Sequence, residues 1–112
     1  MATTEFAAGV RHDGGTAVLV LHGEISSAAE EELQEAYGQV RDEGAVVLDF
    51  SAVDYINSTG IALIVGLLAE ARKNGQVLQA RGLVEHYREI FRITRLSDFM
   101  TILDDEGEAS DD

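Results

Sequence analysis

The sequence predicts a single α/β domain built on a mostly parallel sheet. Apolar, strand-like segments alternate with segments of helical periodicity in the order β-β-α-β-α-β-α-β. Such alternation is typical of a parallel sheet with helices packed on it. The chain has 112 residues, enough for one buried core, and contains no proline, so glycine marks the turns. We therefore expect a sheet of about five strands, the first of which runs antiparallel.

A β-hairpin is predicted at the start of the chain. Residues 5–12 and 16–25 are two strand-like runs, the second nearly continuous in apolar and β-branched residues. Asp13-Gly14-Gly15 lies between them, and an Asp-Gly pair favours a tight turn. The first two strands should therefore pair antiparallel.

The first helix is predicted from Ser27 to about Arg41. Ser27 and Glu30 match the capping-box pattern, which places Ser27 at the N-cap. One face of this helix carries apolar residues at helical spacing, and we expect that face to be buried: Leu33, Ala36, Tyr37 and Val40.

The rest of the sheet and two more helices follow residue 44. In chain order we expect a strand at 45–50, a helix from about Thr59 to Lys73, a strand at 76–81, a helix at 84–93 and a strand at 98–103. The strand AVVLDF is of the kind buried on both faces, with Asp49 at its end bracing the next loop through hydrogen bonds. Asn74-Gly75 is a typical helix stop. The 84–93 helix should bury Val84, Tyr87, Ile90 and Phe91.

The charge of the chain is strongly negative. Lys and Arg total 8 against 21 Asp and Glu, a formal charge of −13. Residues 104–112 carry six acids and no base, so residues 1–103 hold −7 and form the predicted domain. We expect 104–112 to be a disordered acidic tail. Because nucleic acids and anionic lipids need clustered Lys and Arg, the expected partner is another protein.

The sequence lacks the residues or motifs that several classes of function require. The chain has no cysteine, and His12, His22 and His86 share no motif, so we expect no metal site. No Gly-rich phosphate loop indicates bound ATP, and no cofactor is expected. No nucleophile–base–acid set can be named, which argues against an enzyme. No apolar stretch is long enough for a membrane span or a signal peptide, so we expect a cytoplasmic protein.

The candidate functional site is the polar string Asn57-Ser58-Thr59-Gly60. It should lie beyond a parallel strand and at the start of a helix, where ligands gather in α/β sheets. The helix N-terminus would stabilise an added negative charge by roughly 0.3–1 kcal/mol. Helix capping alone explains one of the three polar residues. The apolar helix that follows is either buried all round or carries an exposed apolar patch beside the hydroxyls.

Residues 4–103 resemble the STAS domain family, in its stand-alone form as a bacterial anti-sigma factor antagonist. The resemblance rests on Leu21-x-Gly23-Glu24-Ile25, on Leu48-Asp49-Phe50-Ser51 and above all on VDYINSTGIALI. YREIFRITRLSDFMTI is similar to the last helix and strand of the family.

The resemblance implies a phosphorylation-controlled binding protein. Ser58 aligns with the serine that an ATP-using anti-sigma factor kinase phosphorylates, and Thr59 is the runner-up acceptor. A metal-dependent serine phosphatase would reverse the step. The unmodified form would bind the kinase and free a sigma factor, while the phosphorylated form would let go. A monomer or weak dimer is expected. The alternative is a constitutive STAS scaffold in a stress-sensing complex.

Partner contacts are expected around the same loop and on the end of the second strand: Asn57, Ser58, Thr59, Gly60, Ile61, Leu63, Glu24 and Ser26. Three features depart from the family. Asn57 stands where an Asp usually precedes the serine, and Ser26 stands where an Asp often contacts the kinase. The third concerns the end of the chain: many members carry a further helix after the last strand, whereas only an acidic tail is expected here, so that helix is either missing or supplied by another chain.

Overall fold

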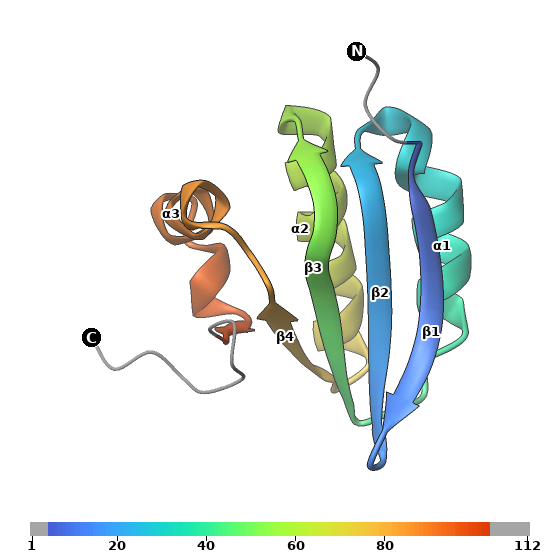
Figure 1. Ribbon diagram of the computed structural model, residues 1–112. Helices are drawn as coiled ribbons and strands as arrows, with labels where there is room; N and C mark the ends of the chain where they lie inside the picture. Colours follow the sequence, from blue (N-terminus) through green and yellow to red (C-terminus); the bar gives the residue numbers. More distant parts are fainter. Residues whose placement is uncertain (1–4, 104–112) are drawn as a thin grey trace.

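Five strands and three α-helices follow one another in the predicted order in the computed structural model, which describes residues 5–103 (Figure 1). Two short 3₁₀ turns, Ser27–Ala29 and Leu96–Asp98, precede α1 and β5. In chain order the elements are β1 Ala7–Asp13, β2 Thr16–Ile25, α1 Glu30–Gly38, β3 Ala45–Ile56, α2 Ser58–Lys73, β4 Val77–Arg81, α3 Glu85–Ile93 and β5 Thr101–Ile102. None of these helices has both the length and the apolar character needed to cross a membrane.

The strands lie in the sheet in the order β1-β2-β3-β4-β5. β1 runs antiparallel to β2, and the remaining neighbours pair in parallel, as the sequence predicts. The hairpin turn uses two glycines with positive φ, Gly14 at 58° and Gly15 at 91°. A tight turn between strands favours glycine there because residues with a Cβ rarely adopt this backbone conformation.

The core lies between one face of the sheet and the helices. α1 and α2 cover that face (Figure 1). Leu33, Ala36 and Tyr37 of the predicted helix face are buried there in α1, and Val40 is buried just beyond it, because α1 ends at Gly38 and not near Arg41 as predicted. Phe91 of α3 joins the same core by packing edge-on against Phe50 of β3, with ring centroids 5.9 Å apart. All three helices therefore contribute to one core.

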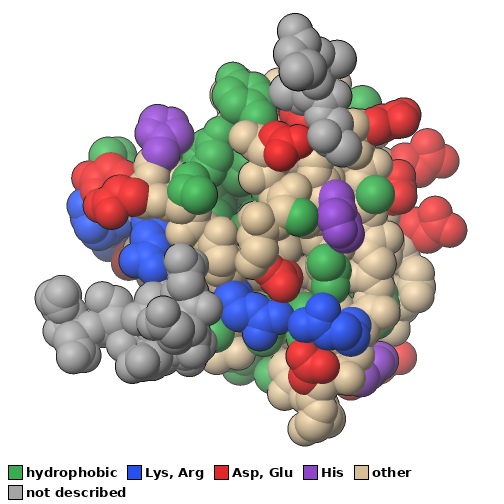
Figure 2. Space-filling view, in the orientation of Figure 1, with side chains coloured by type: hydrophobic (Ala, Val, Ile, Leu, Met, Phe, Trp, Pro, Cys, Tyr) green, Lys and Arg blue, Asp and Glu red, His purple; other side chains and the backbone are tan. Residues whose placement is uncertain are grey.

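The other face of the sheet carries no helix from the described residues (Figure 1). The strand expected at 45–50 nevertheless has buried residues on both faces, with Val46 and Leu48 in the main core and Val47 opposite. Val18 and Val47 are nonetheless buried on this face, outside the main core. Basic and acidic side chains lie side by side over it (Figure 2). The long aliphatic stems of arginines can cover apolar surface in this way while their charged heads stay in water.

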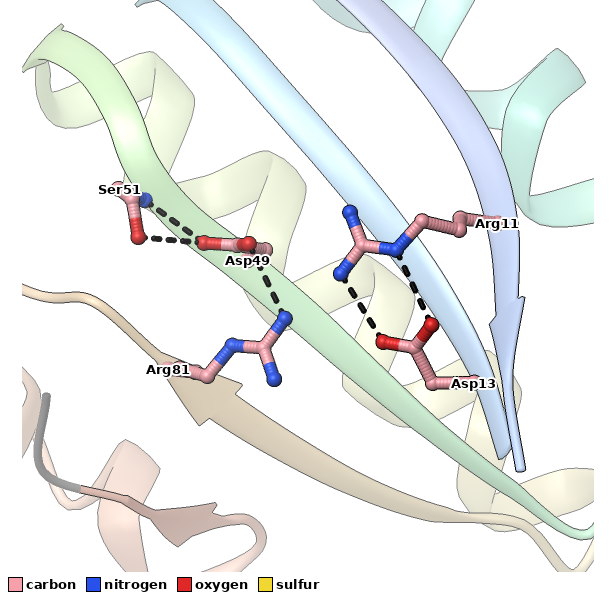
Figure 3. A network of polar contacts seen from close by, with 5 residues as sticks. All are labelled: Arg11, Asp13, Asp49, Ser51 and Arg81. Carbon is pink, nitrogen blue, oxygen red and sulfur yellow. Dashed lines mark hydrogen bonds and ion pairs between the residues drawn. The ribbon is translucent and has the colours of Figure 1, made fainter. Parts of the chain in front are cut away.

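Asp49 is the centre of the polar contacts on this helix-free face (Figure 3). It accepts hydrogen bonds from the Ser51 hydroxyl at 2.7 Å and the Ser51 N–H at 3.0 Å, and pairs with Arg81 at 3.2 Å. Partial burial raises the pKa of Asp49, but the hydrogen bonds from Ser51 and Arg81 outweigh it and leave the pKa below its usual value. Asp49 thus lies within β3 and contacts Ser51 and Arg81, so its predicted role of bracing the 57–60 loop is wrong.

A buried polar cluster joins α1 to the end of α2. The side chain of Gln76 is buried, accepts a hydrogen bond from the Tyr37 hydroxyl, and donates to the carbonyls of Val40 at 2.9 Å and Glu43 at 2.7 Å. Asn74 also donates to the Tyr37 hydroxyl, at 3.2 Å. These bonds fix the chain after α1 against the predicted helix stop at Asn74-Gly75, where Gly75 has φ 71°.

Several predicted boundaries are wrong for local reasons. Ser27 is not the N-cap of α1, because it begins the 3₁₀ turn Ser27–Ala29. No side chain makes a capping hydrogen bond to this turn or to α1. β3 continues to Ile56, past two register shifts against β2 that interrupt the alternation of its residues. The last strand is reduced to Thr101–Ile102. Val84 precedes α3 as its N-cap and is 59% exposed, so it is not part of the buried face.

Candidate functional site

Asn57-Ser58-Thr59-Gly60 forms the junction between β3 and α2. Asn57 has extended backbone angles and is the N-cap of α2, and its side-chain Oδ1 accepts the Gly60 N–H at 2.8 Å. The Asn57 carbonyl accepts the Ile61 N–H at 2.9 Å, which begins the helical hydrogen-bonding pattern. The helix therefore starts at Ser58, one residue earlier than predicted, and Asn57 supplies the capping oxygen.

Ser58 and Thr59 are both exposed in the first turn of α2. Neither hydroxyl makes a hydrogen bond to any other group within residues 5–103. Because Asn57 already caps the helix, helix capping does not account for either hydroxyl. Their backbone N–H groups are among the first of the helix and so have no acceptor inside it. The site thus combines a free hydroxyl with free N–H donors.

The end of β2 lies directly against this loop. The Asn57 N–H donates to the Ile25 carbonyl at 3.2 Å, and Ile25 is in register with Ile56. Gly60 is buried against the same carbonyl. Glu24 and Ser26, which flank Ile25, are half-buried. The structure therefore brings the predicted contact residues of β2 beside the predicted loop.

Apolar side chains surround the hydroxyls to different degrees. Ile61 and Leu63 are half-buried and pack against the core, so α2 is neither buried all round nor fully exposed beside Ser58. Tyr55, three residues before Ser58, is 46% exposed. Sequence reasoning missed Tyr55 because it ended this strand at residue 50, and a signal was present in the aromatic and β-branched residues of VDYI.

α3 is joined to the end of β3, next to the 57–60 loop. The Ile56 N–H donates to the Tyr87 hydroxyl at 3.0 Å, so the end of β3 is tied to α3. Val84, the N-cap of that helix, lines a small depression with Val53 and Ile56. Figure 2 shows apolar side chains along this hollowed part of the surface. Apolar groups are therefore exposed both on β3, at Tyr55, and at the start of α3, at Val84.

The described residues do not bring together three or more metal-ligating side chains of the His, Cys, Asp and Glu type. His12 contacts Glu43 at 3.2 Å, while His86 stacks edge-on against Tyr87. The 57–60 loop itself offers hydroxyl groups and backbone N–H donors beside partly exposed apolar side chains.

The fold and the loop define a two-layer α/β protein that presents, at the amino end of a helix, a serine hydroxyl with no hydrogen-bond partner in the described part of the chain. Residues 8–104 match the family model described as "Mlab, STAS domain". The chain belongs to the STAS domain family.

Two curated relatives with similar sequences have the same name. The chain is 33% identical over 88 residues to the "Anti-sigma-B factor antagonist" of Listeria monocytogenes, covering 77% of both chains. It is 34% identical over 82 residues to the protein of the same name from Staphylococcus epidermidis, covering 71% of this chain and 76% of the relative. These relatives are thus similar over most of the domain.

Solved structures share the fold. An anti-sigma factor antagonist from Mycobacterium paratuberculosis superposes with a TM-score of 0.70 at 25% identity, covering 88% of this chain and 85% of that one. The Bacillus protein SpoIIAA in its phosphorylated form gives a TM-score of 0.65 at 18% identity, covering 86% of this chain and 90% of that one. The likeness to SpoIIAA shows that the two proteins share the same fold.

Proposed function

We propose that this protein is an anti-sigma factor antagonist whose binding to an anti-sigma factor is switched by phosphorylation of Ser58. The observation that carries the proposal is the exposed Ser58 hydroxyl, which has no hydrogen-bond partner within the described residues while Asn57 caps the helix. A hydroxyl that served the helix would be bonded to it. The names of the curated relatives support an anti-sigma factor as the partner.

A phosphate on Ser58 suits the start of α2. It adds a charge of about −1.5 to −2 and three strong acceptor oxygens. The N–H groups of Ser58 and Thr59 have no acceptor inside the helix, and the helix dipole favours negative charge at this end. The modified protein should therefore keep its fold.

The same phosphate would oppose a partner seated on the loop. Half-buried Ile61 and Leu63 and exposed Tyr55 are the apolar groups near the hydroxyl. A partner that covers them would have to desolvate a doubly charged group, and burial of an unpaired charge is costly. Unmodified protein would bind the anti-sigma factor and free a sigma factor, and phosphorylation would end that binding.

The chemistry is supplied by the partners, and the chain itself acts as a binding protein. A serine kinase moiety of the anti-sigma factor would transfer the γ-phosphoryl group of ATP to Ser58 Oγ, which loses its proton, and ADP leaves. A metal-dependent serine phosphatase would hydrolyse the ester to restore the hydroxyl. A chain of this fold is known in both states, since SpoIIAA has been solved unphosphorylated and phosphorylated.

Phosphopeptide mapping of the protein from its native cells tests the acceptor. Trypsin should release residues 42–72 as one peptide that contains Ser51, Ser58 and Thr59, so fragmentation must assign the phosphate. We expect one phosphate, on Ser58, that is removed by phosphatase treatment. A phosphate on Thr59 would move the switch by one residue. Protein that carries no phosphate under either resting or stress conditions would favour the constitutive scaffold.

Variants test the consequence for binding. We expect Ser58→Ala to retain the anti-sigma factor in pull-downs from native cells and Ser58→Asp to lose it. Thr59→Val is the matched control, because it removes the neighbouring hydroxyl and leaves Ser58 intact. If Ser58→Asp and Ser58→Ala retained the anti-sigma factor equally, the proposed switch would be wrong.

A further inference from the structure

A second surface lies at the far end of α2 from the switch loop. With a rise of about 1.5 Å per residue, Arg72 lies roughly 20 Å along the helix from Ser58. Val65, Leu68 and Arg72 recur along one side of α2 at helical spacing. The 3₁₀ turn Leu96–Asp98 and Phe99 face this side across two adjoining cavities of about 270 and 430 Å³.

The two cavities adjoin at Arg72 and Phe99, which line both, and we refer to the pair of cavities as the Arg72–Phe99 groove. The Arg72 guanidinium lies over the Phe99 ring, 4.9 Å from its centroid. Val65 is 45% exposed and Phe99 is 50% exposed, and Leu68 and Leu96 line the smaller cavity beneath them. Large apolar groups that remain exposed around a hollow are typical of a protein interaction site.

The charged side chains that line the groove carry more positive than negative charge, whereas the whole chain is strongly negative. The formal charge of the whole protein is −13, yet the basic side chains lining the groove are Arg72 and Arg95. The Asp98 carboxylate, which lines the larger cavity, is paired with Arg95 at 2.6 Å. Among the described residues Arg72 faces an aromatic ring and forms no ion pair. The guanidinium of Arg72 is therefore available to a carboxylate from outside.

We propose that this Arg72–Phe99 groove binds an acidic amphipathic segment of another protein. Apolar side chains of the segment would contact Val65, Leu96 and Phe99, and a Glu or Asp would pair with Arg72. An amphipathic helix that docks its apolar side chains into a groove is a common mode of peptide recognition. The surface is separate from the 57–60 loop, so a partner held here stays bound in both states of Ser58.

A designed peptide probes the groove directly. The probe is a fluorescently labelled helix of about 15 residues with leucine on one face and glutamate on the other. Its matched control carries lysine in place of every glutamate. The overall charge of −13 attracts the lysine peptide and repels the glutamate peptide, so a preference for glutamate can come only from local charge. We expect the glutamate peptide to bind more tightly by fluorescence anisotropy.

Variants locate the binding. We expect Arg72→Gln and Phe99→Ala each to weaken binding of the glutamate peptide at least about tenfold, as removal of central contacts does in interfaces. Lys73→Gln is the matched control, because it removes the same charge from the next residue, which does not line the groove. Circular dichroism verifies that Phe99→Ala is folded. Ser58→Asp should bind the peptide as wild type does, whatever its effect on the anti-sigma factor.

Three outcomes would overturn the proposal. One is equal or tighter binding of the lysine peptide. Another is equal weakening by Lys73→Gln and Arg72→Gln, which would show a general charge effect. The third is self-association in sedimentation that Phe99→Ala abolishes, which would assign the groove to a second copy of the chain.

Discussion

Gly60 lies directly against the carbonyl oxygen of Ile25, and a Cβ built on Gly60 would be 2.1 Å from that oxygen. The same oxygen accepts the Asn57 N–H. The end of β2 and the start of α2 therefore hold each other in place through backbone atoms, which cannot move aside as a flexible side chain can. The position of the Ser58 hydroxyl relative to Glu24 and Ser26 depends on this contact.

Gly60→Ala is expected to destabilise the protein. The added methyl group meets backbone, and overpacking of this kind costs about 1–3 kcal/mol or more in the free energy of unfolding. Gly66→Ala in the same helix is the matched control, because a Cβ there meets nothing within 4 Å. Since alanine is the better helix former, that change should stabilise by up to ~1 kcal/mol. Urea unfolding measures the free energy of unfolding of both variants. Equal changes in the two variants would contradict the close packing of Gly60.

Asn57→Ala should lower the free energy of unfolding by about 0.5–2 kcal/mol, because it removes the oxygen that accepts the Gly60 N–H. Asn57→Asp keeps a capping oxygen and adds a negative charge at the amino end of the helix, so its stability should match or exceed that of wild type. Thermal unfolding followed by circular dichroism measures both. A loss of stability in Asn57→Asp as large as in Asn57→Ala would show that the cap is not what Asn57 provides.

Gln76→Leu is expected to cost about 2 kcal/mol or more, because the carbonyls of Val40 and Glu43 would each lose a buried donor. Gln39→Leu is the control, since Gln39 is exposed after α1 and surface changes lie within about 0.5 kcal/mol. The comparison uses urea unfolding at neutral pH. If the two variants were equally stable, the Gln76 bonds would contribute nothing net.

The stability contributed by Asp49 should depend on pH. Its pKa in the folded protein is lowered, so its contribution is present above the unfolded pKa of about 3.9 and is lost as the pH falls through the folded value. Asp49→Asn should therefore be less stable than wild type at pH 7, and the difference should shrink below about pH 4. Urea unfolding at a series of pH values measures it. A difference that stayed constant through the acid range would contradict a charged Asp49.

Some features of the 57–60 loop could be predicted from the sequence and others could not. The run of polar residues before an apolar helix predicted both the helix start and the location of the candidate site. It could not decide which of Asn57, Ser58 and Thr59 caps the helix, since all three side chains are suited to it. The hydrogen bond from the Gly60 N–H to Asn57 Oδ1 identified Asn57 as the cap, and within residues 5–103 the Ser58 hydroxyl has no hydrogen-bond partner. The predicted tail, residues 104–112, lies outside the described residues.

The sequence by itself determined the order of strands and helices, the buried face of α1 and the helix stop at Asn74-Gly75. These features depend on the spacing of neighbouring residues, which a linear pattern records. Only the tertiary structure decided the length of β3, the exposure of Val84, the helix-free face around Asp49 and the burial of Gly60 against Ile25. Each depends on contacts between residues far apart in the chain, and local periodicity carries no information about which distant groups meet.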